Sequence, residues 1–153
     1  GLGIGSLKPI NANHDTEYHS SSVYSGSFDY QWPLSSWLST SLMVHESGGE
    51  GTMPTKSEYK YYKSGIIGLQ LKIWMGPLYL GVHGGQYYLT WIESMSAYSG
   101  IQQAGGSGYS VGFETSSGWF LVAFSDQSET LSFDEMPDQQ VEGNRVMLGY
   151  RWK

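Results

Sequence analysis

The first residues in this sequence that could do chemistry are potential metal ligands near its start. Histidine nitrogens and carboxylate oxygens can ligate Zn²⁺. Their spacing here matches no strong metal-binding motif, so the sequence predicts no bound metal and no other cofactor. The set comprises His14, Asp15, Glu17 and His19 in the stretch NANHDTEYH, and His45 with Glu46 further along.

Pairs of histidine and serine are the second candidate for chemistry. Acyl transfer or deacylation requires a base beside a nucleophile, with an acid that orients the base. His45 lies close to Ser47, and His83 is expected on an inward face. No His–Ser pair comes with a matched acid on an apolar outer face, and chance proximity is common in a serine-rich chain. The sequence therefore predicts a protein that is not an enzyme.

Five charged residues form the third group, and four of them fall at similar distances from short turns or from the chain end. Asp29 lies three residues before Trp32, and Lys72 lies four before Gly76. If their segments are strands of one closed sheet, these charges meet at one level of its interior, where unpaired charges are costly and a hydrogen-bonded ion network is expected. Arg145 lies higher, within reach of Gln127 or Glu129. The predicted lumen charge network is Asp29, Lys72, Glu114, Arg145 and Arg151.

The segments that carry these residues alternate between apolar and polar side chains with period two, as β-strands do. The sequence predicts an all-β fold, an eight-stranded antiparallel up-and-down transmembrane β-barrel, as a single domain over residues 1–153. The expected strands are 1–8, 22–32, 36–46, 61–75, 78–93, 104–116, 119–129 and 142–152.

Composition explains why such a barrel would lie in a membrane. Charged residues make up 14% of the chain and aromatic residues 15%, whereas about 25% charged residues is typical of soluble domains. The net charge is −6 without a basic run, which argues against a nucleic-acid partner. No apolar stretch is long enough for a membrane helix, and there is no cysteine. Strand-like sequence begins at Gly1, which fits a mature chain without its targeting segment.

Two faces can be assigned along the strands. One is apolar and is expected to face lipid, and the other is small and polar and suits a narrow interior. The apolar face is predicted to hold Leu2, Ile4, Tyr24, Phe28, Tyr30, Leu38, Leu42, Val44, Ile67, Leu69, Leu71, Ile73, Leu78, Leu80, Val82, Tyr109, Val111, Phe113, Phe120, Val122, Phe124, Val146, Leu148 and Tyr150. The polar face is predicted to include Ala123, Ser125 and Gln127 between Phe120 and Ser128.

Aromatic residues gather at the two ends of the predicted strands, as they do at the two interfaces of a bilayer. At the end with the short turns, the predicted girdle is Trp32, Trp37, Trp74, Trp119, Tyr150 and Trp152. At the other end, Trp91 is accompanied by Tyr24, Tyr61, Tyr62, Tyr87, Tyr88 and Tyr98.

The connections alternate between short and long. WPLSSW, MGPL and TSSGW carry the proline, glycine and serine of tight turns. The long connections, near residues 9–21, 47–60, 94–103 and 130–141, contain most of the acids: Asp15, Glu17, Glu50, Glu58, Asp134, Glu135 and Asp138.

The closing segment, Leu148-x-Tyr150-x-Trp152, resembles the C-terminal aromatic signal of bacterial outer-membrane β-barrels. The whole chain is similar in plan to the small eight-stranded members of that class, such as the OmpA transmembrane domain and OmpX. This resemblance implies a Gram-negative outer membrane, periplasmic termini, extracellular long loops, and recognition by the barrel-assembly machinery.

The expected function is that of a non-enzymatic structural, surface-interaction or accessory component of the outer membrane, with a charge-plugged lumen. Its expected partners are outer-membrane lipid and a protein bound through the long loops or the barrel wall. Two alternatives remain open at this point. One is a narrow, porin-like channel for ions or small solutes that is gated by the charge network. The other is a soluble ligand-binding barrel, although no lipocalin-like Gly-x-Trp occurs on the first strand.

Overall fold

The computed structural model describes residues 2–5, 8–11, 19–52, 61–94, 97–98, 100–134 and 136–152. All regular structure in these residues is β-strand, so the predicted fold class is confirmed at the level of an all-β, antiparallel, up-and-down sheet. None of the described residues forms a helix that is long and apolar enough to span a membrane.

Eight strands carry the up-and-down path in the described residues, and each corresponds to one of the predicted ranges. They are β1 (Leu2–Gly5), β3 (His19–Pro33), β4 (Leu38–Thr52), β5 (Tyr61–Met75), β6 (Leu78–Ser94), β8 (Gln102–Glu114), β9 (Trp119–Ser128) and β11 (Met136–Tyr150). Three shorter strands extend the sheet at the end away from the short turns: β2 (Lys8–Asn11), β7 (Ala97–Tyr98) and β10 (Leu131–Phe133).

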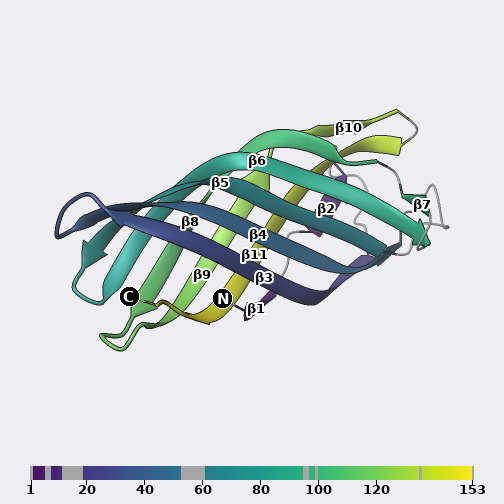
Figure 1. The fold of residues 1–153 in the computed structure, drawn as a ribbon. Coiled ribbons are helices and arrows are strands. Elements are labelled where there is room, and N and C mark those ends of the chain that lie inside the picture. Colours follow the sequence, from purple (N-terminus) through teal and green to yellow (C-terminus); the bar gives the residue numbers. More distant parts are fainter. Residues whose placement is uncertain are drawn as a thin grey trace.

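The strands pair with their neighbours in the order β1, β3, β4, β5, β6, β8, β9, β11. The sheet curls so that β8, β9 and β11 face β3 to β5 across an interior (Figure 1). β1 also pairs with β11, where Leu2 to Gly5 lie opposite Leu148 to Arg145. On its other side β1 pairs with β3 through Leu2 and Gly3 alone. The short β1 thus pairs with both ends of the path over a few residues, and the described strands do not form a barrel that is closed along its length.

The turns at one end are short, as expected from their proline, glycine and serine. Gly76 and Gly118 have positive φ angles of 66° and 93°, a region that side chains with a Cβ rarely adopt. The Gly118 amide donates to the carbonyl of Thr115 at 3.0 Å, and the Thr115 hydroxyl donates to the carbonyl of Trp119 at 3.1 Å. These contacts fix the β8–β9 turn without a long loop.

The opposite end contains more strand than predicted. β4 continues to Thr52 and β11 begins at Met136, so residues 47–52 and 136–141 are strand rather than loop. The reason is that these extensions cover an apolar interior cluster, described below. Glu50 and Asp138 therefore lie on strands, and Asp134 lies in the β10–β11 turn. Asp15, Glu17, Glu58 and Glu135 lie outside the described residues.

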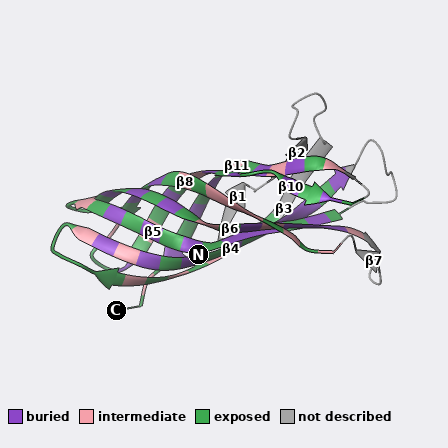
Figure 2. Ribbon diagram, turned by 90° about the horizontal axis from the view of Figure 1, so that it is seen from above, coloured by how far each residue is buried: buried purple, intermediate pink, exposed green. Residues whose placement is uncertain are grey.

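Burial alternates residue by residue along the strands (Figure 2). On β5 the odd-numbered positions other than Gly65 are exposed, and the even-numbered ones other than Trp74 are buried. The exposed set near the short turns is apolar, from Ile67 to Met75, whereas Lys63 at the other end is exposed and Tyr62 beside it is buried. The sheet therefore reverses its polarity along its length: it is apolar outside near the turns and apolar inside beyond them.

The predicted faces agree with the structure on β3, β4, β5, β6, β8 and β11, and are wrong on β9. Phe120, Val122 and Phe124 point inward, and Val122 is 2% exposed. Leu121 is half exposed, and Ala123 and Gln127 lie on the outer face with it. Both faces of this strand are apolar near the turn, so alternation alone did not distinguish them. The side chains of Leu2 and Ile4 lie outside the described part.

Candidate functional site: the charged interior and its wall

Four of the five charges predicted for the lumen meet inside the sheet near the short turns. Lys72 Nζ on β5 donates to Asp29 Oδ2 on β3 at 2.6 Å and to Gln31 Oε1 at 3.2 Å. Arg151, which follows β11, donates to Asp29 Oδ1 at 3.4 Å and to Glu114 on β8 at 2.5 Å. Two cations and two carboxylates thus bridge four strands, and Asp29 is the shared member.

A neutral layer of polar side chains follows above these charges. Gln70 Nε2 on β5 donates to Ser110 Oγ on β8 at 2.7 Å, and Ser41 on β4 donates to Gln70 Oε1 at 3.5 Å. All three residues are buried. The hydrogen bond from Gln70 to Ser110 passes over Gly81 on β6, because β6 lies between β5 and β8 in the sheet.

Arg145 does not join the lower network, and its partner differs from the one expected. Its Nε donates to Asp126 Oδ2 at 3.0 Å and its Nη2 donates to Asp126 Oδ1 at 3.2 Å. His83 Nε2 lies 2.7 Å from Asp126 Oδ1, and the Tyr87 hydroxyl donates to the same oxygen at 3.1 Å. Gln127 points outward. Asp126 was absent from the predicted network because the predicted inner face of β9 is the observed outer face.

The pair of His45 and Ser47 lacks the geometry of a catalytic triad. His45 Nε2 lies 2.8 Å from Ser47 Oγ and 3.2 Å from Ser25 Oγ, and all three residues are buried. The other ring nitrogen of His45, Nδ1, has no partner among the described residues. No described acid therefore orients this imidazole, and the buried acid Asp126 contacts His83 instead.

An apolar cluster fills the interior beyond these polar layers. Trp91, Tyr62 and Tyr87 belong to it and are essentially unexposed, so their predicted place in a second outer aromatic band is wrong. The indole of Trp91 donates to Gln139 Oε1 at 2.9 Å. The side chain of Tyr98 lies outside the described part. The interior apolar cluster consists of Met43, Tyr62, Ile66, Tyr87, Leu89, Trp91, Leu131, Phe133 and Val141.

Five of the six predicted girdle residues lie on the outer surface near the short turns. Trp119, Tyr150 and Trp152 form a row of edge-to-face contacts with ring centroids 5.4 and 5.7 Å apart, and Trp32 and Trp37 are also exposed. Trp74 is the exception. Its neighbour Ile73 is exposed, so Trp74 points inward, where its indole donates to Ser39 Oγ at 2.8 Å and its ring packs on Tyr79.

Tyrosines mark the level at which the outer surface of β3 to β6 becomes polar. Tyr24 and Tyr88 donate to the two oxygens of Glu46 at 3.3 and 3.2 Å, and Lys63 Nζ lies 3.9 Å from the same carboxylate. Partial burial and the Glu46 carboxylate raise the pKa of Tyr88, so its hydroxyl remains a donor at neutral pH. Gly48 provides room for the Tyr24 ring, because a Cβ there would lie 2.5 Å from the tyrosine hydroxyl oxygen.

The potential metal ligands are not brought together in the described part of the chain. No group of three or more histidine, aspartate or glutamate side chains there could hold a metal ion. His14, Asp15 and Glu17 lie outside the described residues, as does the side chain of His19.

Comparisons of the chain with protein-family models, with curated proteins and with solved structures find no match.

Proposed function

We propose that this protein is an integral outer-membrane β-barrel without enzymatic activity, and that it acts as a structural or surface-interaction component of a Gram-negative envelope. In the proposed barrel, β1 bridges the two ends of the sheet, since it pairs with both β3 and β11. The short turns and the termini face the periplasm, and the long connections face outward. The barrel-assembly machinery inserts the chain, and a partner protein binds through the outer connections or the wall.

The observation that carries this proposal is the polarity of four rows of outward side chains across β6, β8, β9 and β11. The two rows nearer the turns are apolar, and the next two become polar. From the turns upward they are Leu78, Phe113, Leu121 and Leu148; Leu80, Val111, Ala123 and Val146; Val82, Tyr109, Ser125 and Asn144; and Gly84, Ser107, Gln127 and Glu142.

On β5 the exposed apolar belt has nearly the extent that a bilayer requires. On β5 it runs from Ile67 to Met75, which is about 26 Å of strand at about 3.3 Å per residue. A tilt of roughly 40° reduces this to about 20 Å, close to the apolar band of about 25 Å on known barrels. Soluble monomers rarely expose contiguous apolar patches of more than a few hundred Å². Lipid is the environment that stabilises this surface.

The interior contains a hollow of about 300 Å³ beside Asp29, Gln70 and Lys72, but the packed apolar cluster beyond it supports a structural role over conduction. A permeating ion would have to pass the charge network around Asp29, the Gln70 layer and the Asp126 group. It would then meet the interior apolar cluster, whose members are almost all unexposed. Opening such a path requires repacking of close-fitting side chains, which are costly to displace. The alternative of a gated channel would need that rearrangement.

Cysteine labelling in lipid vesicles tests the proposal, because the chain contains no cysteine of its own. The variant Leu121→Cys places its thiol on the apolar belt, and Val122→Cys places it in the interior. With the protein refolded into vesicles, a bilayer-partitioned maleimide is expected to label Leu121→Cys fully and Val122→Cys at least tenfold more slowly. Urea-treated protein, in which both sites are accessible, is the control.

Two results would contradict the proposal. Equal labelling of both folded variants from the aqueous phase, with no vesicle association on flotation, would indicate a soluble barrel. Steady unitary currents in a planar bilayer that change with Lys72→Ala would favour the channel instead, whereas silence in both proteins agrees with the filled interior.

A further inference from the structure

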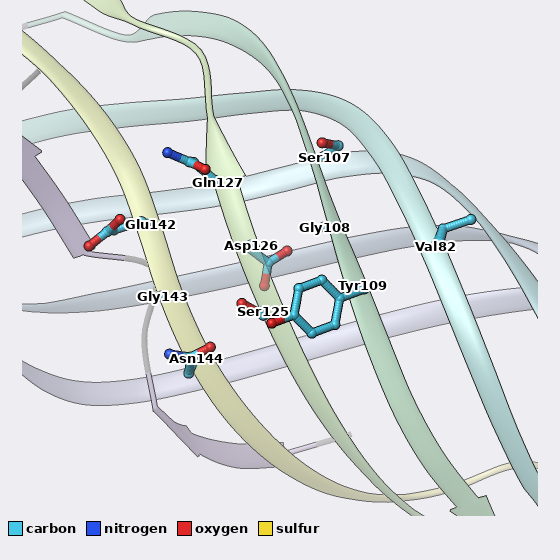
Figure 3. Close-up of a pocket in the computed structure, with 10 residues that line it drawn as sticks. All are labelled: Val82, Ser107, Gly108, Tyr109, Ser125, Asp126, Gln127, Glu142, Gly143 and Asn144. Atoms are coloured by element: carbon cyan, nitrogen blue, oxygen red, sulfur yellow. The ribbon is translucent and has the colours of Figure 1, made fainter.

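A hollow in the outer wall lies at the level where the apolar belt ends, and none of the contacts described above occupies it (Figure 3). It has a volume of about 440 Å³ and lies over the two upper rows of β6, β8, β9 and β11. Small residues, Ser107, Gly108 and Gly143, leave the space. Tyr109 stands at its edge with 63% of its surface exposed.

The groups around this hollow are hydrogen-bonding side chains without an internal role. The outer side chains of β9 and β11 beside the hollow include Gln127, Glu142 and Asn144. Within the described part of the chain, the amides of Gln127 and Asn144 have no hydrogen-bond partner. Each amide offers two donors and one acceptor oxygen. Together with the Tyr109 ring, they present the combination of a flat apolar surface and polar edges that suits a sugar ring.

The charges of the lining disfavour an anionic ligand. Its residues include Glu142 and Asp126 and no lysine or arginine, and Arg145, which lines an adjoining hollow, has a buried side chain paired with Asp126. The Asp126 carboxylate is buried and bound to Arg145, so it does not contribute a free charge to the hollow. The remaining carboxylate, Glu142, would repel a phosphate and accept hydrogen bonds from hydroxyl groups. Neutral hydroxyl-rich chemistry therefore fits the site better than phosphate.

A second hollow, of about 390 Å³, adjoins the first on the side of the membrane belt. The two share Tyr109, Ser125 and Asn144, and the second continues past Ala123 to Val146. Its lining is mostly apolar because it lies over the second row of the wall. A polar recess that opens directly into an apolar one matches a molecule with a polar head and a hydrocarbon chain.

We propose that this double hollow binds a glycolipid of the surrounding membrane, with the sugar headgroup beside Tyr109, Gln127, Glu142 and Asn144 and an acyl chain against Ala123 and Val146. The inference rests on the proposed function, because only a membrane-embedded wall presents the site to lipid. The Tyr109 ring stacks on the sugar, the amides bind its hydroxyls, and the apolar recess selects a lipid over a free sugar.

The test uses the full chain in nanodiscs that contain equal amounts of glucosyl-diacylglycerol and a phosphatidylethanolamine with the same acyl chains. Native mass spectrometry of the released protein measures which lipid stays bound. The wild type is expected to retain the glycolipid in about tenfold preference. Tyr109→Ala and Asn144→Ala should each reduce this preference roughly fivefold, the effect of losing one polar or stacking contact.

Matched controls keep the result specific to the hollow. Tyr61→Ala removes an exposed tyrosine from β5, and Gln103→Ala removes an exposed amide from β8, and neither residue lines the hollow. Both should retain the wild-type preference. Equal retention of the two lipids, or the same loss in the control variants, would overturn the inference.

Competition with a soluble sugar tests whether the ligand must be a lipid. Methyl glucoside at millimolar concentration should leave the bound glycolipid in place, and its displacement of the lipid would overturn the proposed role of the apolar recess. Failure of the chain to insert into nanodiscs would overturn the proposed function together with this inference. Normal insertion without lipid preference would overturn this inference alone.

Discussion

Asp126 organises more of the interior than any charge that the sequence pattern singled out. Its two oxygens contact Arg145, His83 and Tyr87 within a fully buried group. Burial of both charges is costly, and the pair is tolerated because the bidentate contact and the tyrosine satisfy the carboxylate. The Arg145 guanidinium also lies over the Phe124 ring, with its carbon 4.3 Å from the centroid. Loss of either Asp126 or Arg145 alone would therefore leave the other charge buried without its partner.

Removal of one partner of this pair should destabilise the protein strongly. We expect Arg145→Met to lower the free energy of unfolding by about 3 kcal/mol, because the Asp126 carboxylate then stays buried without its guanidinium. Urea titration of the protein in lipid vesicles, followed by gel mobility, measures this loss. The double variant Arg145→Met with Asp126→Leu should lose less than Arg145→Met alone. Losses that simply add would show that the two residues do not interact.

At the scale of strands, close contact between β5 and β6 depends on glycine at one point. A Cβ at Gly85 would lie 2.3 Å from the carbonyl oxygen of Ile67, whereas a Cβ at Gly84 would have its nearest neighbour, the carbonyl oxygen of Gly106, at 3.4 Å. Gly84 is exposed on the outer face. The two adjacent glycines are therefore unequal, although the sequence presents them as a pair.

Gly85→Ala is expected to impair folding, because the added methyl group forces β5 and β6 apart and weakens their hydrogen bonds. A loss of about 1–3 kcal/mol is typical of such overpacking. Refolding yield into vesicles and the urea midpoint measure the effect. Gly84→Ala is the control and should behave like the wild type. Equal urea midpoints for the two variants would contradict this prediction, because the added methyl group would then not weaken the pairing of β5 and β6.

The strands themselves were predictable because alternation with period two survives wherever one face is apolar and the other is polar. It failed on β9, where Phe120 and Leu121 are both large and apolar. A second constraint was present in the sequence: if Trp119 faces lipid, then Leu121 must do so too and Asp126 must point inward. The same argument places Trp74 inside, since Ile73 is outside. The interior cluster around Trp91 was unpredictable from alternation, because its strands keep their period while the two faces exchange polarity.

At the scale of the whole molecule, the exchange of polarity divides the sheet into two zones. Near the short turns, the outside is apolar and the inside holds charges beside a small apolar cluster of Tyr79, Val122 and Met147, and charges inside an apolar wall are typical of a membrane barrel. Beyond the level of Tyr109 and Glu46, the outside is polar and the inside is a packed apolar cluster, as in a soluble barrel. The second zone is stabilised by ordinary burial, so the proposed membrane barrel would project from the bilayer as a packed sheet in its described residues.

The position of the boundary can be measured with two substitutions on the outer face of β8. Val111 lies in the second, apolar row and Ser107 in the fourth, polar row. An arginine on the lipid face costs about 2–4 kcal/mol at the bilayer centre and roughly 0–1 kcal/mol near its surface. We expect Val111→Arg to show the larger loss and Ser107→Arg little change, by urea unfolding in vesicles. Val111→Ala, which removes packing without adding charge, separates the effect of lipid from that of lost contact area. Equal losses for the two arginine variants would place both rows in the same solvent, and the bilayer would then have to lie elsewhere on the wall.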